Sequence, residues 1–568
     1  MREKIVLAIL ATFFAVSAFA QVTVKGKVIN KLTGEGIEGA VIRVDGKLGG
    51  CTTNTEGIFE IANVAEGKHS IRITHISFLP LKSEFTTDAQ PELVFELEEN
   101  YMNLGQVVVT GTGTHHRMSK SPIPVNVITA KDIRNSSATS LEDVLTKLNP
   151  SFSFSTNGMG TTMTLNGVNQ DYVLILVNGK KMAGDDTYSR INIDNIKRIE
   201  VLNGAASALY GSDAIGGVIN VITDDPKNTV DISSNTRVSS YERISESVNA
   251  TISNGKFSSY TNYRYAQSGN WQLNPYDQDS LLTGKMNSTG YRSHNADQRF
   301  VYDFNRNLSV YVRGSYYNHS TKRPGDTKSQ DKKDPEKFKP AYTYDLKHEN
   351  YLYGAGMKYI VNPKIYLEAD FYSDNSKAEK EYFGNESKHE AGERTLDKKK
   401  HFYDGTVRGI FKLGGRNKLS AGAEYIYESL DSEKTSSANP ISESMYTVSL
   451  FAQDEWNIGK GFSAVGGVRY IYHRNFKSYA TPNISVMYNY KGFNVRLAYA
   501  GGFRTPDLAQ IHTTSESKGG SKLTLPNLDL KPEKSNYYTL NVEYNHARFS
   551  VRATGYYNDM HDTILAAF

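Results

Sequence analysis

The sequence has few of the residues and motifs that mark chemical sites. It has 568 residues but a single cysteine, Cys51, so an intrachain disulfide is excluded. Lys and Arg total 65 against 61 for Asp and Glu, and this even balance gives no indication of a nucleic-acid partner. No Gly-x-Ser-x-Gly, His-Glu-x-x-His or phosphate-loop motif occurs in the chain. We therefore do not expect an enzyme.

Long apolar runs are also scarce. The run Ile5–Phe19 follows Arg2 and Lys4 and ends in small residues, which predicts a signal peptide over residues 1–20. No later run reaches the roughly 18 apolar residues that a membrane helix needs. A membrane β-barrel is still allowed, because its strands place apolar residues only at alternate positions.

Tyrosine is abundant and unevenly placed. The chain has 37 tyrosines, and only four of them precede residue 230. From residue 229 onward, segments of roughly ten alternating residues recur between turns and polar loops. Phe493, Val495 and Leu497, for example, alternate with Asn494 and Arg496. These features predict an antiparallel transmembrane β-barrel over residues 229–568, with about 15 strands and long loops at 319–346 and 376–400.

Three segments precede this barrel. Residues 21–98 alternate between short strands and turns, which predicts a small β-sandwich. Residues 99–120 form a linker. Residues 121–228 mix strands with two short helices, 130–134 and 140–148, and Asn178-Gly179 predicts a hairpin turn. The fold class is thus mainly β, with an α/β unit in the middle.

The run Arg198–Thr223, RIEVLNGAASALYGSDAIGGVINVIT, closely resembles the end of the plug domain in TonB-dependent receptors. It departs from the family where Asn203 and Ala205 replace an Arg and a Pro. Residues 21–98 similarly resemble the carboxypeptidase-regulatory-like domain that precedes some of these receptors. The plug signature comprises Gly204, Tyr210, Gly211, Gly216 and Gly217.

This resemblance implies a place and an energy source. It implies the outer membrane, with the N-terminal domain in the periplasm and TonB, with ExbB and ExbD, as partner. The linker run resembles the TonB box, a strand donor for a partner's sheet, although such a run also suits an edge strand. The residues of this run are Gln106, Val107, Val108, Val109, Thr110, Gly111 and Thr112.

Two further runs resemble the paired boxes that bracket an extracellular loop in these receptors. In haem receptors a histidine between the boxes binds haem iron, and His512 occupies this interval. By our strand count the loop is about the seventh outside loop. Tyr188, Met159 and Met163 are additional candidate ligand residues of the plug. The residues that carry the boxes are Phe503, Arg504, Pro506, Pro526, Asn527 and Leu528.

The resemblance predicts active import of an iron complex, with haem ranked ahead of a ferric siderophore and cobalamin third. The cargo is the only bound cofactor expected, and a surface lipoprotein or host haem protein is a further expected partner. Family barrels have 22 strands, so a count of about 15 predicts a C-terminally truncated chain. The alternative function is a surface binder that does not transport.

Overall fold

The computed structural model describes most of residues 21–565, and these form two compact units. The first unit contains the N-terminal domain, and the second contains the α/β unit and the long sheet. Among the described residues, no helix is long and apolar enough to cross a membrane. Within 21–565 the description leaves out residues 32–33, 46–49, 76–77, 88–92, 99–109, 114–120, 158–159, 184–187, 224–229, 270–289, 323–327, 331–337, 341–343, 384–388, 434–439, 491, 517–522 and 547–548.

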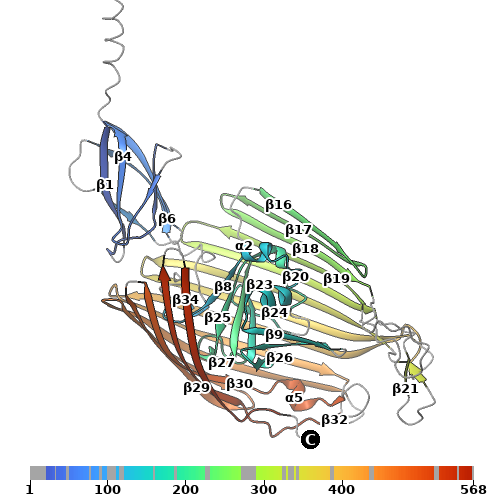
Figure 1. Cartoon of the computed structure of the whole chain (residues 1–568). Coiled ribbons are helices and arrows are strands. Elements are labelled where there is room, and N and C mark those ends of the chain that lie inside the picture. Colours follow the sequence, from blue (N-terminus) through green and yellow to red (C-terminus); the bar gives the residue numbers. More distant parts are fainter. Residues whose placement is uncertain are drawn as a thin grey trace, which may run out of the picture. The chain divides into compact units, whose positions relative to one another are not determined.

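The N-terminal domain is built from two sheets, with strand orders β4-β1-β7 and β3-β2-β5-β6 (Figure 1). Alternating apolar residues from both sheets share one core, in which Phe59 and Val28 are almost fully buried. His69 is structural, as its ring bonds the Asp45 carboxylate at 2.6 Å. The strands are β1 (Gln21–Asn30), β2 (Val41–Val44), β3 (Gly50–Thr52), β4 (Ile58–Ala65), β5 (Lys68–His75), β6 (Phe78–Thr86) and β7 (Leu93–Leu97).

The α/β unit has a five-stranded sheet of order β13-β12-β15-β14-β8 and a small sheet of order β11-β10-β9. Both predicted helices are present, α2 (Ala130–Asn135) and α3 (Leu141–Leu148), and side chains of Thr129 and Ser140 cap them. The predicted hairpin turn joins β12 to β13, with positive φ at both Asn178 and Gly179. The other elements are β8 (Asn126–Thr129), β9 (Phe152–Asn157), β10 (Gly160–Leu165), β11 (Val168–Asn169), η2 (Gln170–Tyr172), β12 (Val173–Val177), β13 (Lys180–Lys181), η3 (Ile193–Asn195), β14 (Ile196–Asn203), α4 (Ser207–Tyr210) and β15 (Gly217–Thr223).

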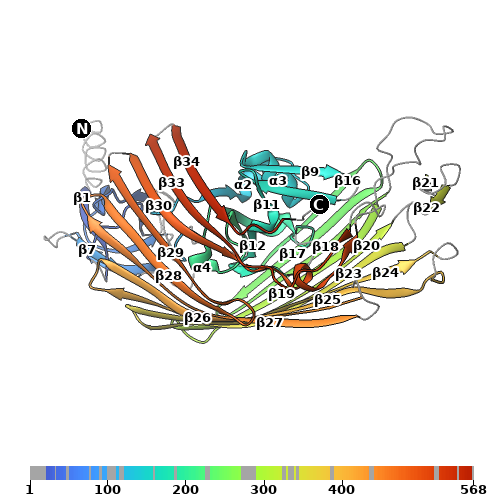
Figure 2. The ribbon, with the colours of Figure 1, turned by 90° about the horizontal axis from the view of Figure 1, so that it is seen from below.

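The long sheet has 15 strands, and it curves around the α/β unit (Figure 2). Strands β16 and β34 are its two edges, so the described sheet does not close on itself. The prediction of an incomplete barrel of about 15 strands is confirmed. The strands in sheet order are β16 (Val230–Ser239), β17 (Arg243–Asn254), β18 (Phe257–Ser268), β19 (Gly290–Asp303), β20 (Leu308–Lys322), β23 (Tyr344–Asn362), β24 (Ile365–Tyr382), β25 (Arg394–Leu413), β26 (Asn417–Ser432), β27 (Ile441–Gly459), β28 (Phe462–His473), β29 (Lys477–Tyr490), β30 (Phe493–Arg504), β33 (Glu533–His546) and β34 (Phe549–His561).

The two faces of this sheet differ sharply in polarity. On β30 the outward Leu497 is 62% exposed, whereas the inward Arg496 is 2% exposed and pairs with Glu543 of β33. Outward apolar side chains suit lipid, and inward polar ones pair with one another or with the enclosed α/β unit. The alternation predicted for this strand is therefore present.

The loops predicted at 319–346 and 376–400 are wrong in extent. Strand β20 continues to Lys322, β24 continues to Tyr382 and β25 begins at Arg394. Charged residues at the ends of these segments instead belong to strands, where cross-strand ion pairs such as Lys380–Asp397 accommodate them. Short elements in the connections are β21 (Lys328–Gln330), β22 (Phe338–Pro340), α5 (Leu508–His512), β31 (Ser515–Glu516) and β32 (Leu523–Thr524).

Candidate functional site

The end of the predicted TonB box is held by the sheet of the α/β unit. Residues 106–109 lie outside the described part of the chain, but Thr110 is fully buried. Its backbone N–H and its hydroxyl donate to one carboxylate oxygen of Glu200, at 2.9 and 2.6 Å. The hydroxyl also accepts from Asn220, and the Tyr210 hydroxyl donates to the Thr110 carbonyl. We call these four side chains, with Arg198, the box anchor.

The anchor rests on a buried charge. Glu200 of β14 has no exposed surface, and Arg198 donates to its second oxygen at 2.7 Å. Asn220 of β15 lies directly opposite Glu200 in the sheet. An ionised carboxylate away from water must be compensated by several donors, and Thr110 supplies two of them. The box segment is therefore part of what stabilises this carboxylate.

The residues that follow Thr110 are tied to the long sheet instead. Gln453 of β27 donates to the Thr112 carbonyl at 2.7 Å, and Arg408 of β25 donates to the Gly113 carbonyl at 3.0 Å. Arg408 is itself paired with Glu368 at 2.5 Å. Between Thr110 and Gly113, the chain is thus bonded first to the α/β unit and then to the long sheet, which we call the wall.

Two glycines of the plug signature lie against the wall. Gly204 has φ +88°, and a Cβ there would lie 2.1 Å from the Tyr537 ring of β33, so both backbone and space require glycine. Gly211 (φ +76°) lies against Arg469 of β28. Gly216 is enclosed by Val168 and the Tyr172 carbonyl, and Tyr210 belongs to the box anchor.

Several ion pairs join the α/β unit to the wall. Arg190 donates two bonds to Asp374 of β24, at 2.8 and 3.0 Å, and both groups are buried. Lys180 pairs with Asp370 at 3.2 Å. Removing either side chain of such a buried pair would leave the other charge uncompensated, so the pairs resist separation of the α/β unit from the wall.

The first predicted loop box contacts the α/β unit, whereas the second is exposed. Phe503 is 1% exposed, and Arg504 pairs with Glu533 at 2.6 Å. The same Glu533 accepts from the Tyr172 hydroxyl of the α/β unit. In the second box, Asn527 and Leu528 are exposed and Pro526 is half-buried, whereas Pro506 of the first box is buried.

His512 is the last residue of α5, and its side chain is half-buried. The helix packs through Leu508 against Leu430 of β26 and Met445 of β27. Strand β30, which precedes it, is the thirteenth of the sheet, as counted from the sequence. Among the described residues, no group of three or more His, Cys, Asp or Glu is placed to hold a metal ion.

Two of the other candidate ligand residues contact each other inside the α/β unit. Met163 is 1% exposed in the core of the α/β unit, and the Tyr188 hydroxyl donates to its sulfur at 3.2 Å. This placement gives both side chains a packing contact with each other and leaves Met163 no ligand-facing surface. Met159 lies outside the described residues.

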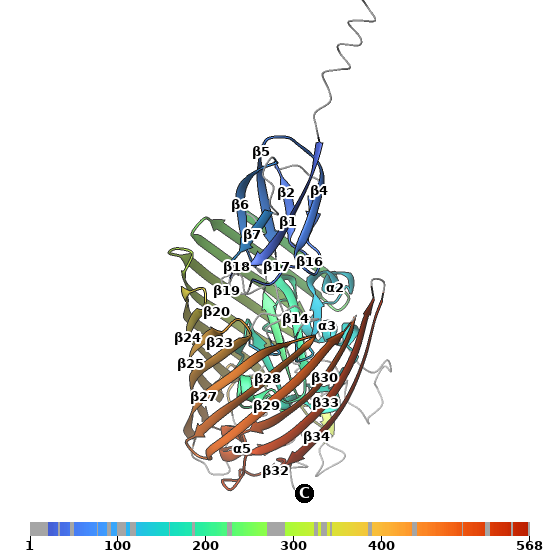
Figure 3. The same cartoon turned by 90° about the vertical axis from the view of Figure 1, so that its left-hand side faces the viewer.

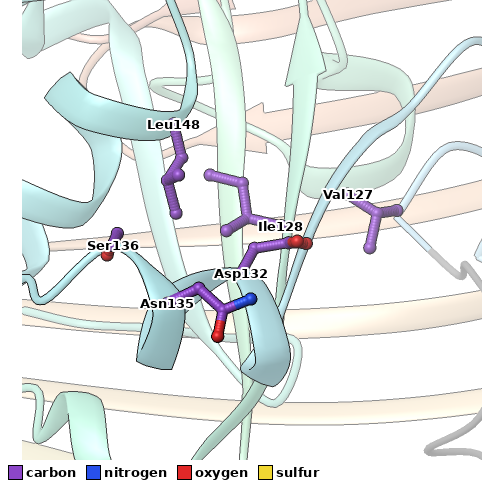
Figure 4. Close-up of a pocket in the computed structure, with 6 residues that line it drawn as sticks. All are labelled: Val127, Ile128, Asp132, Asn135, Ser136 and Leu148. Atoms are coloured by element: carbon purple, nitrogen blue, oxygen red, sulfur yellow. The ribbon is translucent and has the colours of Figure 1, made fainter.

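A recess of about 370 Å³ beside α2 is lined by Ile128, Asp132 and Leu148, among others (Figure 4). Asp132 is already engaged, since it accepts from Thr129 in the cap of α2, and this bond lowers its pKa. The recess has no converging set of free polar groups, so we do not assign it a ligand.

Comparison with known proteins identifies this arrangement. Residues 225–568, more than half of the chain, match the family described as TonB dependent receptor-like, beta-barrel. The chain belongs to the TonB-dependent receptors. Residues 117–218 match the TonB-dependent Receptor Plug Domain, and residues 24–109 match the CarboxypepD_reg-like domain. The α/β unit is therefore the plug, the long sheet is the barrel wall, and the protein lies in the outer membrane.

Relatives and solved structures agree with this assignment. The Iron-regulated outer membrane virulence protein of Vibrio cholerae serotype O1 is 26% identical over 486 residues, which is 81% of this chain and 69% of the relative. Vitamin B12 transporter BtuB of Vibrio vulnificus is 24% identical over 81% of this chain and 71% of its own length. Among solved structures, a mutant of the ferric enterobactin receptor PfeA from Pseudomonas aeruginosa has a TM-score of 0.62 at 19% identity, covering 77% of this chain and 71% of that one. The copper transporter OprC has a TM-score of 0.63 at 14% identity, with 78% and 73% covered. Three of these four are named as receptors or transporters.

The sequence indicated the box, the plug signature and the loop boxes, but not the groups that hold the box. Glu200, Asn220, Arg408 and Gln453 are dispersed over 250 residues of sequence. One signal was present: Glu200 stands between Ile199 and Val201 in an apolar strand, and such a buried acid needs a partner.

Proposed function

We propose that this receptor imports an iron complex through a TonB-coupled release of the box anchor, with haem as first candidate cargo and a ferric siderophore or cobalamin as alternatives. The single observation that carries the proposal is the attachment of Thr110 to Glu200. A box joined to the centre of the plug sheet connects a pull from the periplasm to the structure that blocks the lumen. TonB, energised with ExbB and ExbD, would pair with Gln106–Thr112 as an added strand.

The cargo proposal rests on chemistry and on relatives. An iron-regulated outer-membrane protein, a vitamin B12 transporter and ferric enterobactin receptors resemble this chain. For haem, His512 stands at the end of α5, in the connection that follows the thirteenth strand of the sheet, and imidazole is a good axial ligand for haem iron. A surface lipoprotein or host haem protein would deliver the cargo from outside.

Deletion of residues 106–112 tests the coupling. We expect uptake of the cargo to be lost in cells, while binding of the same cargo to the cell surface remains. The described part of the deleted segment, Thr110–Thr112, is bonded to the plug and to the wall and not to the outer loops. Unimpaired uptake by the deletion variant would refute TonB coupling through this segment. If the intact chain binds cargo at the cell surface but does not take it up, the protein is instead a surface binder that does not transport.

A panel of cargo identifies the ligand. Ferric haem, a ferric catecholate and cobalamin are titrated against the folded receptor and its His512→Ala variant. Haem binding that weakens in the variant supports His512 as an iron ligand. Binding of the catecholate or of cobalamin alone moves that class of cargo to first place.

A further inference from the structure

A buried carboxylate joins the plug to one end of the wall. Glu533 begins β33 and has no exposed surface. One of its oxygens accepts from the Tyr172 hydroxyl of the plug at 2.8 Å and from the Ile564 backbone at 2.6 Å. The other accepts from Arg504, the last residue of β30, at 2.6 Å. A buried charge depends on such donors, so Glu533 holds the plug and the wall together at one point.

The same point is bonded to α5. A second nitrogen of Arg504 donates to the side-chain oxygen of Gln510 at 3.3 Å. That oxygen also accepts from the backbone N–H of Asp507, in the capping box that begins α5. A movement of the first turn of α5 would therefore shift Arg504.

Helix α5 lies at the end of the wall where β30 ends and β33 begins (Figure 3). These two strands are connected by residues 505–532, whereas β27 and β28 are joined at the opposite end by residues 460–461 alone. In outer-membrane barrels, long connections are extracellular and short turns are periplasmic. Helix α5 therefore belongs to the outer side, from which cargo arrives.

A first route leads from Glu533 to the TonB box through β15. The Tyr172 carbonyl accepts from the N–H of Gly216, directly before β15, at 2.7 Å. Asn220 lies on β15, and its side chain donates to the Thr110 hydroxyl at 3.1 Å. One short stretch of backbone is thus bonded to Tyr172 at one end and to the box at the other.

A second route leads from the end of β30 through α4. Phe503 precedes Arg504, and its N–H donates to the Ser207 hydroxyl at 3.1 Å. Ser207 begins α4 and is fully buried. Tyr210 ends α4, and its hydroxyl donates to the Thr110 carbonyl at 3.1 Å. The two routes therefore start at neighbouring residues of β30 and end at the same residue of the box.

We propose that Tyr172, Glu533 and Ser207 are positioning residues through which α5 sets how firmly the plug holds the TonB box. The inference rests on the proposed TonB-coupled import and names the side chains that connect its outer and periplasmic ends. A displacement of α5 by cargo would shift the end of β30, and the bonds that hold Tyr172 and Ser207 would weaken. Coupling between two sites is reciprocal, so TonB binding at the box should in turn loosen α5.

The test uses the full chain folded in detergent and the periplasmic domain of TonB as the probe, so no cargo is needed. Contacts alone are compatible with static packing, and the response of one end to the other is therefore measured. Hydrogen exchange follows α5 at the amides of Gln510, Ile511 and Thr513, which are bonded within the helix and its cap. It follows the box at the amide of Thr110, which is bonded to Glu200.

Two variants interrupt the routes, Tyr172→Phe and Ser207→Ala, alone and together. Each removes one hydroxyl and keeps nearly the same shape, and Glu533 retains its ion pair. The matched control is Tyr499→Phe, which removes a hydroxyl of β30 that is bonded to Asn536 of β33 at 3.0 Å and belongs to neither route. Exchange in α3, which neither route crosses, verifies that the plug remains folded.

We expect TonB binding to speed exchange in α5 at least about fivefold in the wild type and in Tyr499→Phe. Without TonB, each route variant should exchange the Thr110 amide faster than the wild type. In the double variant TonB should still bind, but α5 should no longer respond to it. A purely structural role would loosen both segments without removing the response of one to the other.

Two results overturn the inference. One is a wild type in which TonB binds through residues 106–112 and exchange in α5 is unchanged; the proposed import then stands, and only the coupling is refuted. The other is a double variant in which α5 responds to TonB as in the wild type. If the double variant does not fold, the single variants decide, since each should weaken the response. A receptor that does not bind TonB through residues 106–112 refutes the proposed function itself.

Discussion

Replacing Thr110 with valine should release the TonB box without a signal from cargo. Valine has nearly the shape of threonine, so packing is kept, but the hydroxyl that donates to Glu200 at 2.6 Å and accepts from Asn220 at 3.1 Å is removed. The backbone N–H of residue 110 still donates to Glu200. The change therefore weakens the anchor without leaving Glu200 unpaired.

The size of the effect follows from the charge on Glu200. A hydrogen bond to a charged group contributes about 1.5–3 kcal/mol, and Asn220 loses an acceptor as well. Since 1.4 kcal/mol corresponds to a factor of ten, the population of released segment should rise about 10- to 100-fold. Serine at the same position retains the hydroxyl and should stay close to wild type.

Hydrogen exchange of residues 106–113 measures this release directly, and binding of the periplasmic domain of TonB to the receptor without cargo measures its consequence. We expect faster exchange and tighter TonB binding in Thr110→Val than in Thr110→Ser. If the two variants exchange at the same rate, the hydroxyl does not hold the box, and the anchor as we describe it is refuted.

Three further predictions concern stability. Gly204→Ala places a methyl group against Tyr537 at positive φ and should destabilise plug docking by about 1–3 kcal/mol, as measured by protease susceptibility. The control Gly179→Ala also has positive φ but has open space around the new methyl group, so it should lower stability less. Phe59→Ala should lower the stability of the N-terminal domain by about 3–5 kcal/mol in urea unfolding, because its ring is 2% exposed; an unchanged midpoint would contradict the assigned core. Burial raises the pKa of Asp213, but Lys181 and Arg504 outweigh it and hold the pKa below the ordinary value. The ion pairs of Asp213 with Lys181 and Arg504 therefore stabilise the folded protein fully above about pH 4, the pKa of Asp in an unfolded chain. This stabilisation is lost as the pH falls through the pKa of Asp213 in the folded protein. In thermal melts, Asp213→Asn should therefore lack the loss of stability that this titration causes at acid pH.

Much of the architecture followed from local patterns. Alternation along β30, with Leu497 outward and Arg496 inward, predicts its two faces because side chains on a strand alternate strictly. The helices predicted at 130–134 and 140–148 are α2 and α3, which the side chains of Thr129 and Ser140 cap. The ends of strands were harder to predict from the sequence. Charged residues near 380 and 395 suggested a loop, and only their cross-strand partners show that they belong to strands.

The candidate sites divide along the same line. The sequence by itself determined the family, the order of domains, the number of strands and the candidate site segments, because each rests on residues that are contiguous or regularly spaced. Only the tertiary structure decided that Thr110 is bonded to Glu200, that Met163 belongs to the plug core, and that Tyr172 is bonded to Glu533. These contacts depend on strand register and on the seating of the plug in the wall. Both are set by many weak contacts between distant residues, which no local pattern encodes.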